Sequence, residues 1–276
     1  MWEKRVSKRT QLSLLFAFIM TLLFIILIII FGLNIGVFNS RSIIKSIDQS
    51  DYFNKAYDRI NQKTESIFSE FGLPEDTLSE VITPSRVHAD GMNYVNAILN
   101  NKTQYKAEIN KDIELNIQQY ISNQSEQPSS GVAQLGNAIE EEYKSVVELR
   151  FVDNLMTYKT NYRKLNTILL PFIILLVGIL SYMLIRMYRH RYRGIRYIAY
   201  AMIASSVLIL LIVSFWLLTK EYMGFEVAPD YYQQFVSNYI RMGLMVYVYI
   251  GIMGLVIAIA LITLIGFMRN KIVYKK

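Results

Sequence analysis

Ser85, His88 and Asp90 are the residues of this sequence whose types and closeness suggest hydrolytic or metal chemistry. Serine, histidine and aspartate form the catalytic triads of many hydrolases, but a fold assembles such triads from separate segments. On a helix, His88 and Asp90 stand at i and i+2 and point in different directions. We therefore interpret residues 85–90 as a helix start with a surface histidine, and an outer-surface hydrolase stays open as an alternative.

The other candidate groups suggest little chemistry. Glu140, Glu141 and Glu142 are consecutive, and three adjacent acids do not converge on one ion as a calcium loop does. The chain contains no cysteine, which excludes disulfides, thiolate nucleophiles and cysteine-ligated zinc. A P-loop, a Rossmann glycine pattern and an HExxH motif are also missing. We predict a protein that is not an enzyme, with no catalytic residue, cofactor or metal site.

Four long apolar runs must position everything else in the chain. They cover residues 11–38, 166–185, 197–219 and 241–268, and Arg241 at the start of the fourth run is the only Asp, Glu, Lys or Arg that they contain. A helix that crosses a bilayer needs about 20 apolar residues, so each run is long enough. Apart from Arg241 at the edge of the fourth run, no run contains the Asp, Glu, Lys, Arg or His side chains that proton relays and voltage sensors need inside their spans. The sequence predicts an all-α integral membrane protein with four transmembrane helices.

Basic residues indicate how these helices are oriented. Lysine and arginine are concentrated in residues 1–10, 186–196 and 269–276, and short basic segments stay on the cytoplasmic side. Residues 39–165 and 220–240 are then outside, and both termini are cytoplasmic in a multi-pass protein of the cell membrane. We interpret the basic loop as a topology signal that faces anionic lipid, and we predict no nucleic-acid partner. Its arginines are Arg186, Arg189, Arg191, Arg193 and Arg196.

The larger outer segment, residues 39–165, has the apolar spacing of helices. Phe53, Tyr57 and Ile60 begin a stripe with intervals of three and four, which is typical of an amphipathic helix. Thr83 and Pro84 form a helix stop and start. We expect an α-helical extracytoplasmic domain whose first and last helices extend the first two spans. The last of these helices should run unbroken from Ala133 into the second span.

The shorter outer segment, residues 220–240, combines a Pro-Asp helix start with several aromatic residues. This pattern predicts a short amphipathic helix that lies in the membrane interface as an anchor.

Small residues inside two spans predict close helix packing. Gly32 and Gly36 have the small-xxx-small spacing that lets helix backbones approach, and Asn34 could form a hydrogen bond across such a contact. Gly251 and Gly254 could give the fourth span a similar face. The contact could lie within one chain or between two copies of it, so a homo-oligomer stays open.

The sequence resembles two groups of membrane proteins. Residues 71–82, followed by 87–90 and Tyr94, resemble a pattern in uncharacterised four-span proteins of Gram-positive bacteria. The order of one span, a large outer domain and three further spans is similar to that of permease subunits in macrolide-exporter-type and cell-division-type ABC transporters. The second resemblance implies a separate ATPase that binds near residues 186–196 and the N-terminus.

Three hypotheses for function follow. We favour a non-enzymatic envelope protein that acts as sensor, scaffold or accessory subunit of a membrane complex through its outer helical domain. The bilayer and a membrane-protein partner, or a second copy of the chain, are the expected partners. The alternatives are a mechanotransmitting, permease-like subunit of an ABC transporter and an outer-surface hydrolase.

Overall fold

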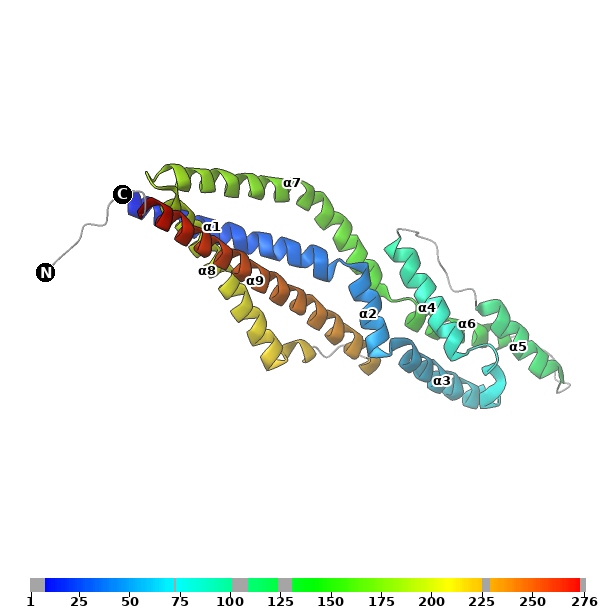
Figure 1. Ribbon diagram of the computed structural model, residues 1–276. Helices are drawn as coiled ribbons and strands as arrows, with labels where there is room; N and C mark the ends of the chain where they lie inside the picture. The colour runs from blue at the N-terminus through cyan, green and yellow to red at the C-terminus, as the bar shows by residue number, and fades with distance from the viewer. Residues whose placement is uncertain (1–7, 72, 101–108, 124–130, 225–228, 274–276) are drawn as a thin grey trace. The chain divides into compact units, whose positions relative to one another are not determined.

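The computed structural model describes residues 8–71, 73–100, 109–123, 131–224 and 229–273. Over these ranges the chain is helical and contains no strand, which confirms the predicted all-α fold class. Figure 1 shows the α-helices in chain order. They are α1 Lys8–Gly32, α2 Ser40–Ser50, α3 Tyr52–Phe71, α4 Pro84–Leu99, α5 Asn110–Asn123, α6 Gly131–Val147, α7 Arg150–Arg186, α8 Arg191–Thr219 and α9 Asp230–Val273.

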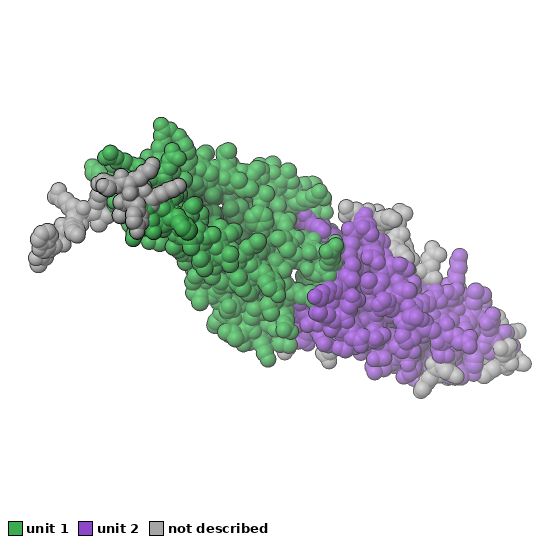
Figure 2. Space-filling model, viewed as in Figure 1, with its two compact units in different colours: residues 1–42, 160–226, 239–276 green, residues 43–159, 227–238 purple. Residues whose placement is uncertain are grey.

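The helices belong to two compact units (Figure 2). Unit 1 comprises residues 1–42, 160–226 and 239–276, and unit 2 comprises residues 43–159 and 227–238. Helices α7 and α9 each contribute residues to both units. Unit 2 therefore takes in residues 227–238, which the sequence analysis had kept separate from the segment 39–165.

Within the residues that the structure describes, four helices are long and apolar enough to cross a membrane, as their length and composition show. They cover Lys8–Val37, Arg150–Arg186, Arg191–Thr219 and Tyr231–Asn270, and each of the four predicted runs lies almost entirely within one of them. Large apolar side chains on these helices are exposed, among them Ile168 at 75%, Leu218 at 81% and Phe267 at 75%. Exposed apolar surface of this extent is typical of a protein whose surroundings are lipid.

The spans of unit 1 pack around α1. Ala17 and Met20 of α1 lie in one buried cluster with Leu184 of α7 and with Tyr197 and Ala201 of α8. Further along α1, Ile28 packs with Ile209 and Val213 of α8, and Leu244 and Tyr247 of α9 lie against that cluster. Helix α1 is thus the common neighbour of the other three spans.

The end of α1 differs from the expected continuous helix. A π-helical turn, Leu33–Val37, follows α1, and the amide of Phe38 donates to the carbonyl of Leu33 at 2.8 Å. The side chain of Asn39 forms a hydrogen bond on each side of this break. Its amide donates to the carbonyl of Ile35 at 3.0 Å, and its oxygen accepts from the backbone amide of Arg41 at 3.0 Å. Because one side chain caps both ends, the chain starts a new helix, α2, at this point.

Unit 2 is built from amphipathic helices whose apolar stripes meet in a common core. Helix α3 begins at Tyr52, one residue before the predicted stripe starts at Phe53, and ends at Phe71. Thr83 caps α4 as expected, since its side chain accepts a hydrogen bond from the amide of Arg86 at 3.2 Å and Pro84 is the first helical residue. The fully buried core residues include Ile43, Ala56, Ile60, Phe68, Val87, Val95, Ile113, Ile117, Ile139 and Tyr143.

Two further expectations about helix continuity were wrong. The helix expected from Ala133 into the second span is divided into α6 and α7. Val147, Leu149 and Val152 around the break are all buried, and one straight helix would turn some of them outward. The separate helix expected within residues 220–240 is also not formed: Asp230 begins α9, whose first turns belong to unit 2.

Candidate functional sites

Helix α4 carries the residues that suggested hydrolytic chemistry. The exposed ring of His88 contacts Phe53 edge to face, with ring centroids 5.4 Å apart. Asp90 faces another helix, because its Oδ2 accepts a hydrogen bond from the Tyr143 hydroxyl of α6 at 2.7 Å. The structure therefore gives the two side chains different surroundings, as their i, i+2 spacing predicted.

Arg86 connects α4 to α5. Its guanidinium donates to Oδ2 of Asp112 at 2.5 Å, and Nε lies 3.9 Å from Oδ2 of Asp90. Burial by itself lowers the pKa of Arg86, but the hydrogen bond and the charge of Asp112 outweigh it and raise the pKa above its ordinary value. Together with Tyr143, these side chains form what we call the polar clamp, namely Arg86, Asp90, Asp112 and Tyr143.

The polar clamp joins three helices of unit 2, namely α4, α5 and α6. Both carboxylates accept hydrogen bonds, and the one cation lies against both of them. Sequence analysis missed this network, because Asp112 and Tyr143 lie far from Arg86 along the chain. Its one local signal was the i, i+4 spacing of Arg86 and Asp90.

Replacing Tyr143 by phenylalanine tests the clamp. The variant keeps the buried ring but removes the donor to Asp90, so we expect unit 2 to lose about 1–2 kcal/mol of stability. Hydrogen exchange of amides in α4 and α6, measured on the full-length protein, reports this change. Tyr57→Phe, at a half-buried tyrosine of the same unit, is the control and should leave exchange unchanged. Equal exchange in the Tyr143→Phe variant would show that the bond contributes nothing.

The acidic run Glu140–Glu142 lies within α6. Glu140 pairs with Lys144 along α6, with 2.5 Å between Oε1 and Nζ, and Glu141 is exposed. Among the residues that the structure describes, no three His, Asp or Glu side chains are placed to hold one metal ion.

Gly32 at the end of α1 and Gly36 in the π-helical turn face α9 of the same chain. A Cβ added at Gly32 would overlap the ring of Tyr247, and one added at Gly36 would lie 3.2 Å from Cβ of Val246. Asn34 donates to the carbonyl of Ile30 at 2.8 Å and to the Tyr162 hydroxyl of α7 at 3.3 Å. A homo-oligomer contact through this face would have to displace α9.

Gly251 and Gly254 of α9 face α8. A Cβ at Gly251 would lie 2.8 Å from Cγ of Leu210, and one at Gly254 would overlap Oγ of Ser206. The hydroxyl of Ser206 is buried and has no hydrogen-bond partner in the described part of the chain. Close approach of the two backbones here depends on glycine having no side chain.

Comparison with known proteins adds no relationship: no family model, curated protein or solved structure matches the chain. What can be concluded about function therefore comes from the residues and their geometry.

The five arginines predicted as a topology signal lie in and around the turn between α7 and α8. Arg186 ends α7 and donates to the Tyr182 hydroxyl, while Arg193 donates to the Tyr192 hydroxyl at 3.5 Å. Arg196 lies over the ring of Tyr197, with its guanidinium carbon 5.8 Å from the ring centroid. Arg189 and Arg191 are exposed.

Tyrosines complete this end of the bundle. Tyr188 stacks on Tyr197 with 5.9 Å between ring centroids, and its hydroxyl lies 2.7 Å from Oγ of Ser13 in α1. We call this region the arginine–tyrosine end of unit 1. Sequence analysis found its arginines but missed the tyrosines that pack with them. Arginine over tyrosine is suited to binding anions, because a guanidinium that packs on a ring has five N–H donors and keeps some of them available for an anion.

Proposed function

We propose that this protein is a non-enzymatic subunit of a membrane complex in the envelope of a Gram-positive bacterium. Unit 2 acts outside the cell as a sensing or scaffolding domain. Both termini and the arginine–tyrosine end lie on the cytoplasmic side of the plasma membrane, where a partner protein receives the signal. The short basic segments support this orientation.

The observation that carries the proposal is the buried position of Phe235 in unit 2. This residue of α9 is fully buried, and its ring lies 5.8 Å from the ring of Tyr52 and 5.8 Å from the ring of Phe151 in α7. Residues of α7 and α9 thus help to form the core of the helical unit, and the same two helices continue as spans. A ligand that repacks this core acts directly on two membrane helices.

The polar clamp supports a structural role for Asp90 over a catalytic one. A hydrolase based on His88 and Asp90 would need the two side chains to converge, whereas Asp90 is engaged with Tyr143 and Arg86. The permease-like alternative remains a competing proposal, which the copurified partner distinguishes.

The orientation is tested by labelling single cysteines in intact cells. The natural chain has no cysteine, so Ser129→Cys introduces the sole thiol. We expect an impermeant thiol reagent to label Ser129→Cys before lysis and to label Arg189→Cys only after lysis. The reverse pattern would overturn the orientation and every role that depends on it.

The partner is tested by affinity purification of the full-length protein in mild detergent at native expression. We expect a membrane protein with a cytoplasmic domain to copurify, and Phe235→Ala to reduce its recovery relative to Gln234→Ala. Recovery of an ATPase with both variants would favour the permease-like alternative. A monomer without partners would contradict the proposal.

A further inference from the structure

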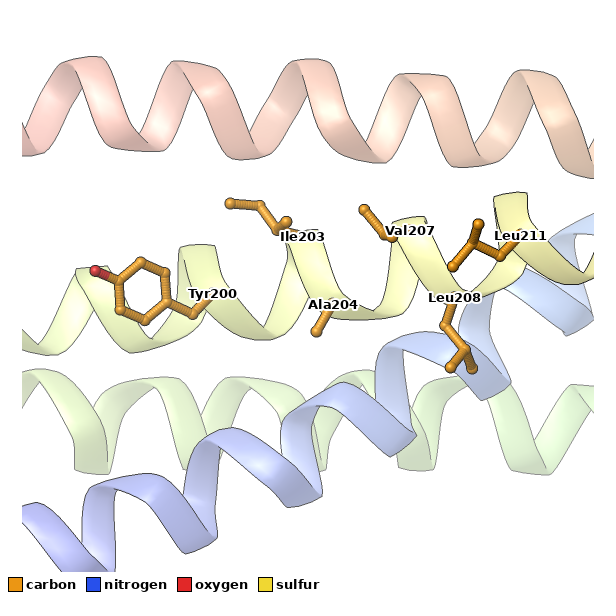
Figure 3. A pocket seen from close by; sticks show the side chains of 6 residues that line it. All are labelled: Tyr200, Ile203, Ala204, Val207, Leu208 and Leu211. Atoms are coloured by element: carbon orange, nitrogen blue, oxygen red, sulfur yellow. The ribbon is translucent and has the colours of Figure 1, made fainter.

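One face of α8 forms a shallow apolar groove of about 300 Å³ (Figure 3). The lining side chains recur at intervals of three and four residues, so they lie on one side of the helix. Apart from the hydroxyl of Tyr200 the lining is apolar, and most of it is exposed. The lining residues are Tyr200, Ile203, Ala204, Val207, Leu208 and Leu211.

Positive charge lies at the Tyr200 end of this groove. Arg193 and Arg196 precede Tyr200 by seven and four positions, so they extend the same helix face. The guanidinium carbon of Arg196 lies 6.0 Å from the centroid of the Tyr200 ring, which also lines the groove. Within the described residues, neither arginine has a carboxylate at ion-pair distance. The face therefore combines unpaired cations at one end with an apolar stripe beyond them.

The length of the stripe matches one leaflet of a bilayer. From Tyr200 to Leu211 the helix rises about 16 Å, and half of the hydrocarbon core is about 15 Å thick. An extended peptide segment would leave its backbone groups without hydrogen-bond partners against so apolar a surface, whereas an acyl chain has no such groups.

From this arrangement we infer that the groove binds one acyl chain of an anionic phospholipid whose phosphate is held by Arg196 and Arg193. Arg196 is placed by its contacts with Tyr197 and Tyr200, so its guanidinium stays near the end of the groove. The inference requires that α8 crosses a bilayer, but it does not depend on the proposed signalling role.

Native mass spectrometry of the full-length protein in mild detergent tests the site. Phosphatidylglycerol and phosphatidylcholine with identical acyl chains are added at equal concentrations, and bound lipid is measured. We expect the wild-type protein to retain more phosphatidylglycerol. Arg196→Gln should lower that binding about fivefold, the equivalent of about 1 kcal/mol for one base at a membrane surface.

Matched variants distinguish the effects of the arginine charge, of the open groove and of the position of the charge on α8. Arg196→Lys keeps the charge and should keep most of the preference, whereas Lys220→Gln removes an exposed charge at the other end of α8 and should have no effect. Ala204→Trp fills the groove and should lower binding of both lipids. Leu208→Trp fills the groove from the next turn of the helix. It replaces Ala204→Trp in the experiment if that variant does not fold.

Three results would overturn the inference. Equal retention of the two lipids would show that the arginines do not select an anionic headgroup. Unchanged phosphatidylglycerol binding in both folded tryptophan variants would show that the acyl chain does not bind in the groove. Displacement of phosphatidylglycerol by an equal concentration of inorganic phosphate would show a site for the headgroup alone.

Discussion

Replacing Phe235 by alanine is expected to destabilise unit 2 by about 3–5 kcal/mol, although this residue lies in the helix of the fourth span. The Phe235 side chain has no exposed surface, and its ring packs against the rings of Tyr52 and Phe151. The Tyr52 hydroxyl beside it donates to the carbonyl of Val146 at 3.0 Å, and burial raises the pKa of Tyr52 well above its ordinary value. Removing the Phe235 ring leaves a cavity inside this aromatic cluster.

Hydrogen exchange of α3 amides in the full-length protein measures the effect. If exchange proceeds through opening of the whole unit, a loss of 3 kcal/mol speeds it more than about a hundredfold. Gln234→Ala is the matched control, because Gln234 is the exposed neighbour and accepts a hydrogen bond only from the exposed Nζ of Lys55. Equal exchange in the two variants would mean that α9 does not belong to the core of unit 2.

Replacing Gly91 by valine should also destabilise unit 2, by about 1–3 kcal/mol. A Cβ at this position would overlap the ring of Phe53, with Cδ1 only 2.8 Å away. Phe53 is itself 3% exposed and packed edge to face against Tyr52 and His88, so its ring cannot move aside without disturbing both. We expect α3 and α4 to separate, which faster hydrogen exchange in both helices would show.

Gly136→Ala provides the control within the same unit. Its Cβ would lie 3.1 Å from Cγ of Glu114, a flexible side chain that can adjust. Since alanine is favoured over glycine in a helix by about 1 kcal/mol, this variant should be neutral or stabilising. If Gly91→Val were as stable as Gly136→Ala, the close contact between α3 and α4 would not be needed.

Local features of the sequence predicted much of unit 2. The apolar stripe that begins at Phe53 predicted α3, and Thr83 with Pro84 predicted the start of α4, because both signals lie within a few residues of the structure that they specify. The break between α6 and α7 was not predictable in this way. It depends on which neighbours cover Val147 and Leu149, and the apolar pattern does not contain that information.

The aromatic residues around Phe235 show the same limit. Tyrosines and phenylalanines after a Pro-Asp start suit a membrane interface and a protein core equally, since both offer apolar contact for the rings. Only the tertiary structure assigns Phe235 to the core of unit 2, through partners such as Tyr52 that are distant in sequence.

The sequence by itself determined the helical class and the four long apolar helices. The cost of placing charges and free backbone groups in lipid is local, so it can be read from each segment separately. Only the tertiary structure decided which surfaces meet: Gly32 against Tyr247, Asp90 with Tyr143, and Arg196 over Tyr200 at the end of a groove. Such pairings depend on shape and distance between remote residues, which composition and periodicity do not specify.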